Sequence, residues 1–202
     1  MNSIDELPIF ALNTVLCPGG HLPLRVFEPR YVDMIKRCMS AGTPFGICLI
    51  RAGHEVGDAA TAHRTGTLAH IVDFDLLDDG LLGITAQGGE RFRIEHTRVL
   101  ADQLLVAVTS AIPAEQETAL PSEYSHLAQI VAALLEHFGR SAVEHERNAA
   151  QATWVGYRLT EMLPMPPAKR QTMLEMEDAL LRLSELDGIV RQLVAHANQG
   201  HL

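Results

Sequence analysis

Residues 22–31 read Leu-Pro-Leu-Arg-Val-Phe-Glu-Pro-Arg-Tyr, a stretch in which a short strand leads directly into a helix. Pro29 fits the first helical position because its ring already holds φ near the helical value. Phe27 can pack inward where the strand ends, and Glu28 can pair with Arg30. The stretch therefore predicts a structural corner between a strand and a helix.

The helix that starts at this corner is predicted to run from Pro29 and to end at Gly42. Its apolar residues recur at helical spacing, which gives the helix one buried face. These residues are Tyr31, Met34, Ile35 and Cys38. We expect the helix to cover one end of a β-barrel.

Strands dominate the rest of the chain up to about Pro113, where short apolar runs are broken by Gly, Pro and Asp. Seven runs read as strands, enough for a closed or nearly closed barrel. The candidate strands are residues 7–10, 22–26, 45–51, 66–77, 81–86, 91–98 and 104–112.

One of these runs has a clear alternation. From Leu68 to Leu76 every second residue is mostly apolar, which predicts one apolar face of a strand with Asp73 and Asp75 on the opposite face. The Asp-Asp-Gly triplet at residues 78–80 then supplies a hairpin turn, because Asp and Gly tolerate positive φ.

The pattern changes to a helical period at Ser122, after the stretch 114–121, which has no clear period. Helices are predicted over residues 122–138, 152–162 and 168–175, with a bend near 177–178 before a last helix. That last helix carries a narrow seam, which packs either within the chain or between two copies of it. The seam consists of Leu183, Leu186, Val190, Leu193 and Ala197.

These patterns together predict an α+β protein. Residues 1–113 form a β-rich barrel domain with one inserted helix, residues 114–121 form a linker, and residues 122–202 form an α-helical bundle. The oligomeric state stays open between a monomer and a homodimer.

Charge and composition narrow the classes of partner and location. The net charge is −9, and the acidic and basic residues divide evenly between the two halves, so neither half predicts a surface for nucleic acid. Three cysteines without a CxxC spacing predict neither disulfides nor a thiolate metal site, which favours a cytoplasmic location. The uncharged stretch 7–24 is interrupted by prolines and glycines, so no membrane span is expected.

No catalytic motif emerges from the sequence. It has no Gly-Lys dipeptide, which removes the GxxxxGK[ST] phosphate loop, and it has no GxGxxG, HExxH or GxSxG. The histidines are scattered, so a metal site is not predicted. We interpret residues 91–93, Arg-Phe-Arg, as surface arginines that flank a core phenylalanine. Catalytic residues, cofactors and metals are therefore all predicted to be absent.

Several segments in order resemble the N-terminal domain family of Lon proteases. The most specific is Phe-Glu-Pro-Arg-Tyr at residues 27–31, and weaker similarity continues to residues 182–183. The other matching segments are residues 7–10, 15–19, 45–46, 55–57, 66–69, 79–80, 88 and 91–93. Two positions depart from the family pattern, because Gln103-Leu104 stands where an aromatic residue is frequent and Cys17 stands where Phe is frequent.

This resemblance implies a pseudo-barrel of the PUA-like type followed by a helical bundle. In full-length Lon enzymes the domain precedes an ATPase and a Ser-Lys protease domain, and it contributes to substrate recognition and assembly. Since neither a phosphate loop nor a protease domain is found in these 202 residues, the chain resembles a stand-alone substrate-binding domain.

The leading hypothesis is a non-catalytic module that binds unfolded or exposed apolar polypeptide segments, as an accessory in protein quality control, together with a separate protease. Such binding needs an exposed apolar groove, which we expect between barrel and bundle. The candidate binding residues are Phe27, Arg30, Tyr31, Phe92 and Trp154. Two alternatives remain: a PUA-like nucleic-acid-binding protein, which the charge balance disfavours, and an enzyme that acts on a small molecule.

Overall fold

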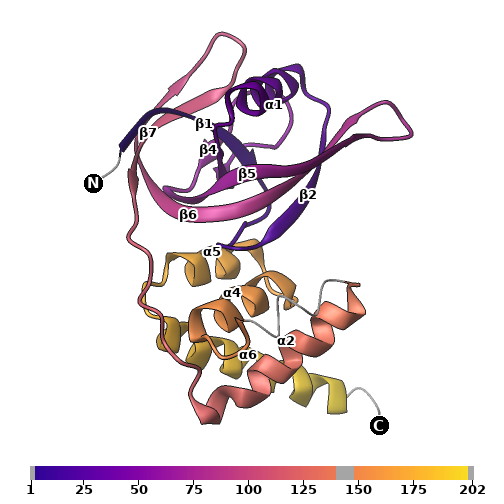
Figure 1. The fold of residues 1–202 in the computed structure, drawn as a ribbon, viewed down its shortest axis with the longest axis vertical. Helices are drawn as coiled ribbons and strands as arrows, with labels where there is room; N and C mark the ends of the chain where they lie inside the picture. The colour runs from indigo at the N-terminus through magenta and orange to yellow at the C-terminus, as the bar shows by residue number, and fades with distance from the viewer. Residues whose placement is uncertain (1–2, 140–147, 200–202) are drawn as a thin grey trace. The chain divides into compact units, whose positions relative to one another are not determined.

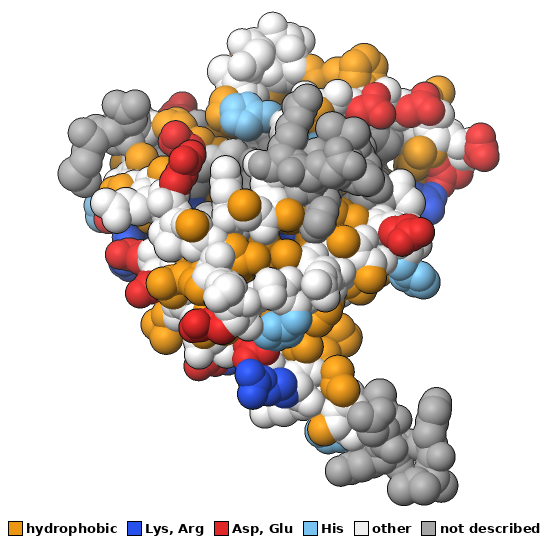
Figure 2. Space-filling model, turned by 60° about the horizontal axis from the view of Figure 1, so that its bottom comes forward, with side chains coloured by type: hydrophobic (Ala, Val, Ile, Leu, Met, Phe, Trp, Pro, Cys, Tyr) orange, Lys and Arg blue, Asp and Glu red, His pale blue; other side chains and the backbone are white. Residues whose placement is uncertain are grey.

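The computed structural model describes residues 3–139 and 148–199, and the chain forms two compact units, Met1–Ala114 and Glu115–Leu202 (Figure 1). The first is mainly β-sheet with one helix and the second is helical, so the α+β class is confirmed. Acidic side chains are more prominent than basic ones on the face shown in Figure 2, as the net charge of −9 leads one to expect. Among the described residues, no helix combines the length and apolar character that crossing a membrane requires.

The strands of the first unit close into a barrel. Hydrogen-bonded neighbours follow the order β1, β7, β6, β5, β3, and β3 then pairs in parallel with β1, which completes the ring. β2 lies outside the ring on β6, and β4 lies on β3. The strands are β1 (Ser3–Leu12), β2 (His21–Val26), β3 (Phe45–Ala52), β4 (Thr61–Ala62), β5 (Thr65–Leu76), β6 (Leu82–Val99) and β7 (Leu105–Ala111).

Two predicted strands, 81–86 and 91–98, are in fact one continuous strand, β6, and β4 was not predicted. The glycines between the two runs predicted an end of the strand. Gly88 instead lies inside β6, where another segment packs against it. The turn at residues 17–20 lies directly on it: the N–H of Gly19 donates to the Gly88 carbonyl at 2.8 Å, and the N–H of Gly88 donates to the Gly20 carbonyl at 2.8 Å. A Cβ on Gly88 would lie 2.1 Å from the Cys17 carbonyl oxygen, so glycine allows this approach.

The alternation predicted for β5 is wrong over its first half. Ala69, not Leu68 or His70, is fully buried, and the strand has a register shift between Ile71 and Asp73. Such a bulge inserts an extra residue, so the side chains after it change faces. Beyond the bulge Phe74 pairs with the buried Ile84, yet Phe74 itself is 61% exposed.

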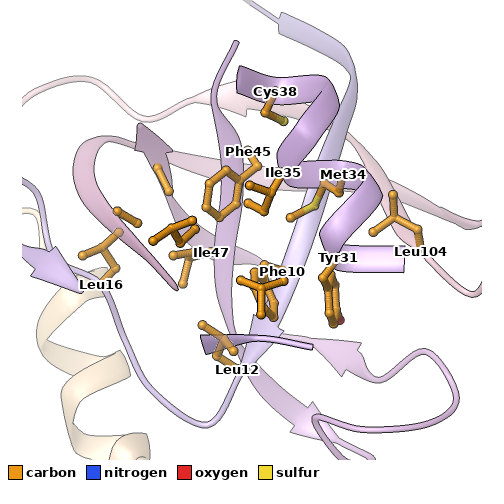
Figure 3. Packing of buried hydrophobic residues seen from close by; sticks show 14 of the residues in the cluster. Phe10, Leu12, Leu16, Tyr31, Met34, Ile35, Cys38, Phe45, Ile47 and Leu104 are labelled. Atoms are coloured by element: carbon orange, nitrogen blue, oxygen red, sulfur yellow. The ribbon is translucent and has the colours of Figure 1, made fainter. Parts of the chain in front are cut away.

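Helix α1 (Pro29–Ala41) follows the prediction. Pro29 occupies its first turn, and Gly42 ends it with φ 65°. The predicted stripe of Tyr31, Met34, Ile35 and Cys38 is buried against the barrel. Figure 3 shows Tyr31 beside Phe10 of β1, and the two rings stack with centroids 3.9 Å apart. The stacking fixes where α1 begins relative to the sheet.

The helical unit contains η1 (Ser122–Tyr124), α2 (Ser125–His137), α4 (Ala152–Met162), α5 (Pro167–Glu175) and α6 (Ala179–Gln199). The predicted bend is a break between α5 and α6, where the Asp178 carboxylate accepts the N–H groups of Leu180 and Leu181 and so caps α6. Leu183, Leu186 and Val190 of the predicted seam are buried in this unit's own core. Leu193 is partly buried there, and the side chain of Ala197 lies outside the described residues.

The stretch 114–121 contributes to this core. The Glu115 carboxylate accepts hydrogen bonds from Arg182 Nη1 at 2.9 Å and Nη2 at 2.5 Å, and from the Tyr157 hydroxyl. Arg182 is fully buried, and its Nε also donates to the Met173 carbonyl at 2.9 Å. The carboxylate from the expected linker therefore ties α4 to α6, and its partner Arg182 adds α5 through the Met173 carbonyl.

A second carboxylate, Asp187, connects α2 with α6. Its Oδ1 lies 2.7 Å from His126 Nε2, and its Oδ2 accepts a hydrogen bond from Arg191 Nη2 at 2.7 Å. The hydrogen bond from Arg191 holds the pKa of Asp187 below its usual value, although burial acts in the opposite direction. The ionised form of Asp187 is therefore more strongly stabilised in the folded unit than in the unfolded chain.

Because the folded pKa is the lower one, this contribution to stability is complete above about pH 4 and is lost as the pH falls through the folded pKa. Replacing Asp187 by Asn is expected to lower the free energy of unfolding by about 1 kcal/mol at pH 7. Urea denaturation at pH 7 and below pH 4 tests this, with Asp33→Asn as the control because Asp33 is an exposed residue of α1. If Asp187→Asn lowered the free energy of unfolding equally at both pH values, the ionised Asp187 carboxylate would not be the source of the stabilisation.

Candidate functional site

The corner between β2 and α1 is held by the side chain of Arg30, which is only 5% exposed. Its Nη1 donates to the Gln103 carbonyl at 2.9 Å, and its Nη2 donates to Glu28 Oε1 at 3.1 Å. Glu28 Oε2 in turn accepts the N–H of Gly57 at 3.3 Å. Arg30 thus fastens the corner to the turn between β6 and β7, while Glu28 fastens it to the loop between β3 and β4.

Beside this corner lies a hollow of about 420 Å³, which we call the corner hollow. Its floor comes from β1, β2 and the start of α1, and its rim includes Phe27 and Val56, whose side chains are 54% and 57% exposed. The lining residues are Phe10, Leu12, Thr14, Leu22, Pro23, Leu24, Arg25, Phe27, Glu28, Tyr31, Glu55 and Val56. A volume of this size is in the range of ligand-binding clefts.

A second hollow of about 380 Å³ lies on β2, β5 and β6, and we call it the outer hollow. The two hollows share Pro23, Leu24 and Arg25, so they meet at β2. The outer hollow is lined further by Asp73, Phe74, Asp75, Leu77, Gly83, Ile84 and Thr85. Within the described residues β2 pairs only with β6, so its other edge is open.

The structure brings three of the five candidate binding residues together. Phe27 and Tyr31 line the corner hollow, and Arg30 lies behind it in the hydrogen bonds described above. The pKa of the Tyr31 hydroxyl is raised, mainly because the side chain is buried. The hydroxyl therefore stays protonated at neutral pH. Tyr31 therefore offers the hollow a largely apolar ring.

Phe92 and Trp154 have other surroundings. Phe92 is 2% exposed and fills a space left by two glycines: a Cβ on Gly46 or Gly66 would come within 2.6 and 2.7 Å of its ring. Trp154 is partly buried against the core cluster of the helical unit. Both side chains pack in cores, and Phe92 leaves too little surface for a partner to contact.

The position of Arg91, next to Phe92, contradicts one prediction. Arg91 was expected at the surface opposite Phe92, but it is 5% exposed, and only Arg93 is exposed. Consecutive burial of Arg91 and Phe92 means that both faces of β6 are covered at this point. The pair of arginines therefore makes no basic surface patch.

Several residues of the corner hollow were not predicted, among them Leu22, Leu24, Glu55 and Val56. Pro23 could have indicated this site, because a proline within a strand is typical of an edge strand. An edge strand beside apolar residues is in turn a typical place for a polypeptide to bind. Glu55 and Val56 come from a loop whose position depends on Glu28, and local sequence patterns do not encode such a contact.

The lining of the corner hollow suits contact with apolar side chains more than it suits covalent chemistry. Among the described residues no group of His, Cys, Asp and Glu could hold a metal ion. The three cysteines are buried, and burial raises the pKa of Cys38 and, far more, of Cys48, so these two thiols stay protonated.

Comparison with protein families gives one match over nearly the whole chain. The family described as the ATP-dependent protease La (LON) substrate-binding domain matches residues 6–192. Among curated proteins, Lon protease 2 of Myxococcus xanthus is 28% identical over 185 residues, which are 88% of this chain and 22% of that protein. Protein cereblon of Danio rerio is 28% identical over 116 residues, 55% of this chain and 26% of that protein. The chain thus spans about a quarter or less of these relatives.

Solved structures give the same result for the fold. The crystal structure of a Lon N-terminal domain protein from Xanthomonas campestris is 34% identical, with a TM-score of 0.76, and the match covers 92% of this chain and 98% of that one. The N-terminal domain of the Mycobacterium avium complex Lon protease has a TM-score of 0.61 over 90% of this chain and 96% of that one. Because the identity is only 17%, the second structure supports a similar fold and nothing further.

Proposed function

Since this chain belongs to the LON substrate-binding domain family, we propose that it is a non-catalytic module that binds unfolded or exposed apolar segments of polypeptides. The observation that carries the proposal is the corner hollow, an apolar depression with exposed Phe27 and Val56 at its rim. Large exposed apolar side chains beside a cleft are typical of sites that bind protein. Such a module fits an accessory role in cytoplasmic protein quality control, in which a separate protease degrades what it binds.

Recognition through side chains fits this surface better than the addition of a strand to β2. An added strand gains its affinity from backbone hydrogen bonds along an open edge. Pro23 in the middle of β2 has no N–H, and proline is one of the devices that discourage pairing at sheet edges. We therefore place the binding energy in apolar side chains of the client that enter the corner hollow.

Phe27→Ala is expected to weaken binding of a permanently unfolded protein, such as reduced and carboxymethylated lactalbumin, about tenfold, because burying a phenylalanine contributes about 1.5–3 kcal/mol. Fluorescence anisotropy with the labelled unfolded protein measures the affinity. The matched control is Val99→Ala, since Val99 is 48% exposed and lines neither hollow.

Both side chains are exposed, so neither variant should change the free energy of unfolding by more than about 0.5 kcal/mol. Equal affinities for the parent and Phe27→Ala would place the binding surface elsewhere. Binding of RNA that falls steeply with salt, without binding of the unfolded protein, would instead support the nucleic-acid alternative.

A further inference from the structure

Carboxylates surround both hollows. Glu28 and Glu55 line the corner hollow, Asp73 and Asp75 line the outer hollow, and Asp79 approaches Arg25, which lines both. Five carboxylates therefore face two guanidinium groups, those of Arg25 and Arg30. The surface around β2 has a net negative charge of its own.

Both guanidinium groups are already engaged. Arg30 is buried and pairs with Glu28 at 3.1 Å, while Arg25 pairs with Asp79. Neither of them compensates the remaining three carboxylates, those of Glu55, Asp73 and Asp75.

The remaining carboxylates accept hydrogen bonds from backbone N–H groups. Asp73 accepts from Phe74 at 2.9 Å, Asp75 accepts from Leu76 at 2.7 Å, and Glu55 accepts from Asn13. Such bonds hold a carboxylate in place and leave its charge uncompensated. In the part of the chain that the structure describes, none of the three forms an ion pair with a basic side chain.

Carboxylates and exposed apolar residues line the same two hollows. Phe27 and Val56 stand near Glu55, and Phe74 stands between Asp73 and Asp75 in the sequence of β5. A segment with apolar residues next to Lys or Arg therefore complements both features of this surface at once.

We propose that the surface around β2 selects client segments in which large apolar residues are flanked by Lys or Arg. The inference rests on the proposed function and specifies the chemistry of its client. Complementary charge gives mainly selectivity and faster association, while the apolar contacts supply the affinity. Because Asp73 and Asp75 are exposed, salt should screen their part of the preference.

The test uses three labelled peptides with one shared apolar centre and with flanks of Lys, Ser or Glu. Affinities are measured by anisotropy at low salt and at about 0.5 M salt, where the Debye length is a few ångströms. At low salt the Lys-flanked peptide should bind about three- to tenfold more tightly than the Glu-flanked one, and high salt should remove most of the difference.

The double variant Asp73→Asn, Asp75→Asn should reduce this preference and leave the affinity for the Ser-flanked peptide unchanged. Its matched control, Asp33→Asn with Glu90→Gln, removes the same charge from exposed positions that line neither hollow. A preference that is equally reduced in both double variants would reflect net charge alone and would overturn the assignment to β2.

The outcomes separate this inference from the proposed function. Equal binding of all three peptides, still weakened by Phe27→Ala, would overturn the charge selectivity and leave the proposed function standing. Binding of none of the peptides, together with no binding of unfolded lactalbumin, would overturn both.

Discussion

Phe92→Ala is expected to lower the free energy of unfolding of the barrel unit by about 3–5 kcal/mol. The ring is 2% exposed and belongs to a cluster with Leu7, Ile9 and Cys48. Gly46 and Gly66 have no side chains with which to fill the space that the ring would leave. The resulting cavity cannot collapse without moving β3 and β5, so the cost should lie near the upper end for such a substitution.

Urea denaturation followed by circular dichroism measures this loss. The control is Phe74→Ala, which removes the same side chain from a position that is 61% exposed and should change the stability by about 0.5 kcal/mol or less. If Phe92→Ala kept its stability but lost binding of unfolded lactalbumin, Phe92 would be a contact residue after all, and its placement in the core would be refuted.

Glu115→Ala should destabilise the helical unit by about 3–5 kcal/mol, because it leaves the Arg182 guanidinium buried without its carboxylate. The Arg182 side chain is 0% exposed, and its carbon Cζ also lies 4.0 Å from the centre of the Tyr157 ring. Removal of one partner from a buried pair costs far more than the pair itself contributes, since the other charge remains desolvated.

A matched pair on the surface of the same unit provides the control. Lys169 and Glu185 form an ion pair at 2.8 Å, and their side chains are 37% and 45% exposed. Glu185→Ala should therefore cost about 0–1 kcal/mol in the same urea titration. If Glu115→Ala and Glu185→Ala lowered the free energy of unfolding equally, the buried pair would contribute no more than the surface pair does.

Much of the fold was predictable because its signals are local. The stripe on α1, its start at Pro29 and its end at Gly42 depend on helical spacing, on the fixed φ of proline and on the tolerance of glycine for φ 65°. The same reasoning located α4, whose apolar positions recur between residues 152 and 162. In each case the decisive interaction lies within a few residues along the chain.

The errors arose where distant segments meet. Gly88 read as a strand break because the turn that packs on it is about seventy residues away in the sequence. The bulge after Ile71 changed the faces of β5 relative to the expected alternation. The alternation of apolar residues also carries no information on which of them the core covers, and Phe74 of the predicted apolar face is 61% exposed.

The candidate site was predicted in part for the same reason. Phe27 and Tyr31 belong to one short motif, and the motif does line a hollow. Arg30 belongs to it as well, but its bond to the Gln103 carbonyl joins residues 73 positions apart. Glu55 and Val56 reach the hollow through a loop contact, which composition and spacing do not reveal.

The closure of the barrel by β1 has a consequence for the order in which the chain folds. β1 pairs with β3, which follows within about forty residues, but also with β7, where Ile9 lies opposite Leu105. During synthesis the first strand must therefore wait for nearly a hundred further residues before both of its edges are covered. A nascent chain shorter than this exposes an apolar strand with an open edge, the kind of segment that chaperones bind and that aggregates when left unprotected. The module that we propose to bind unfolded segments thus passes through such a state itself while it is being made.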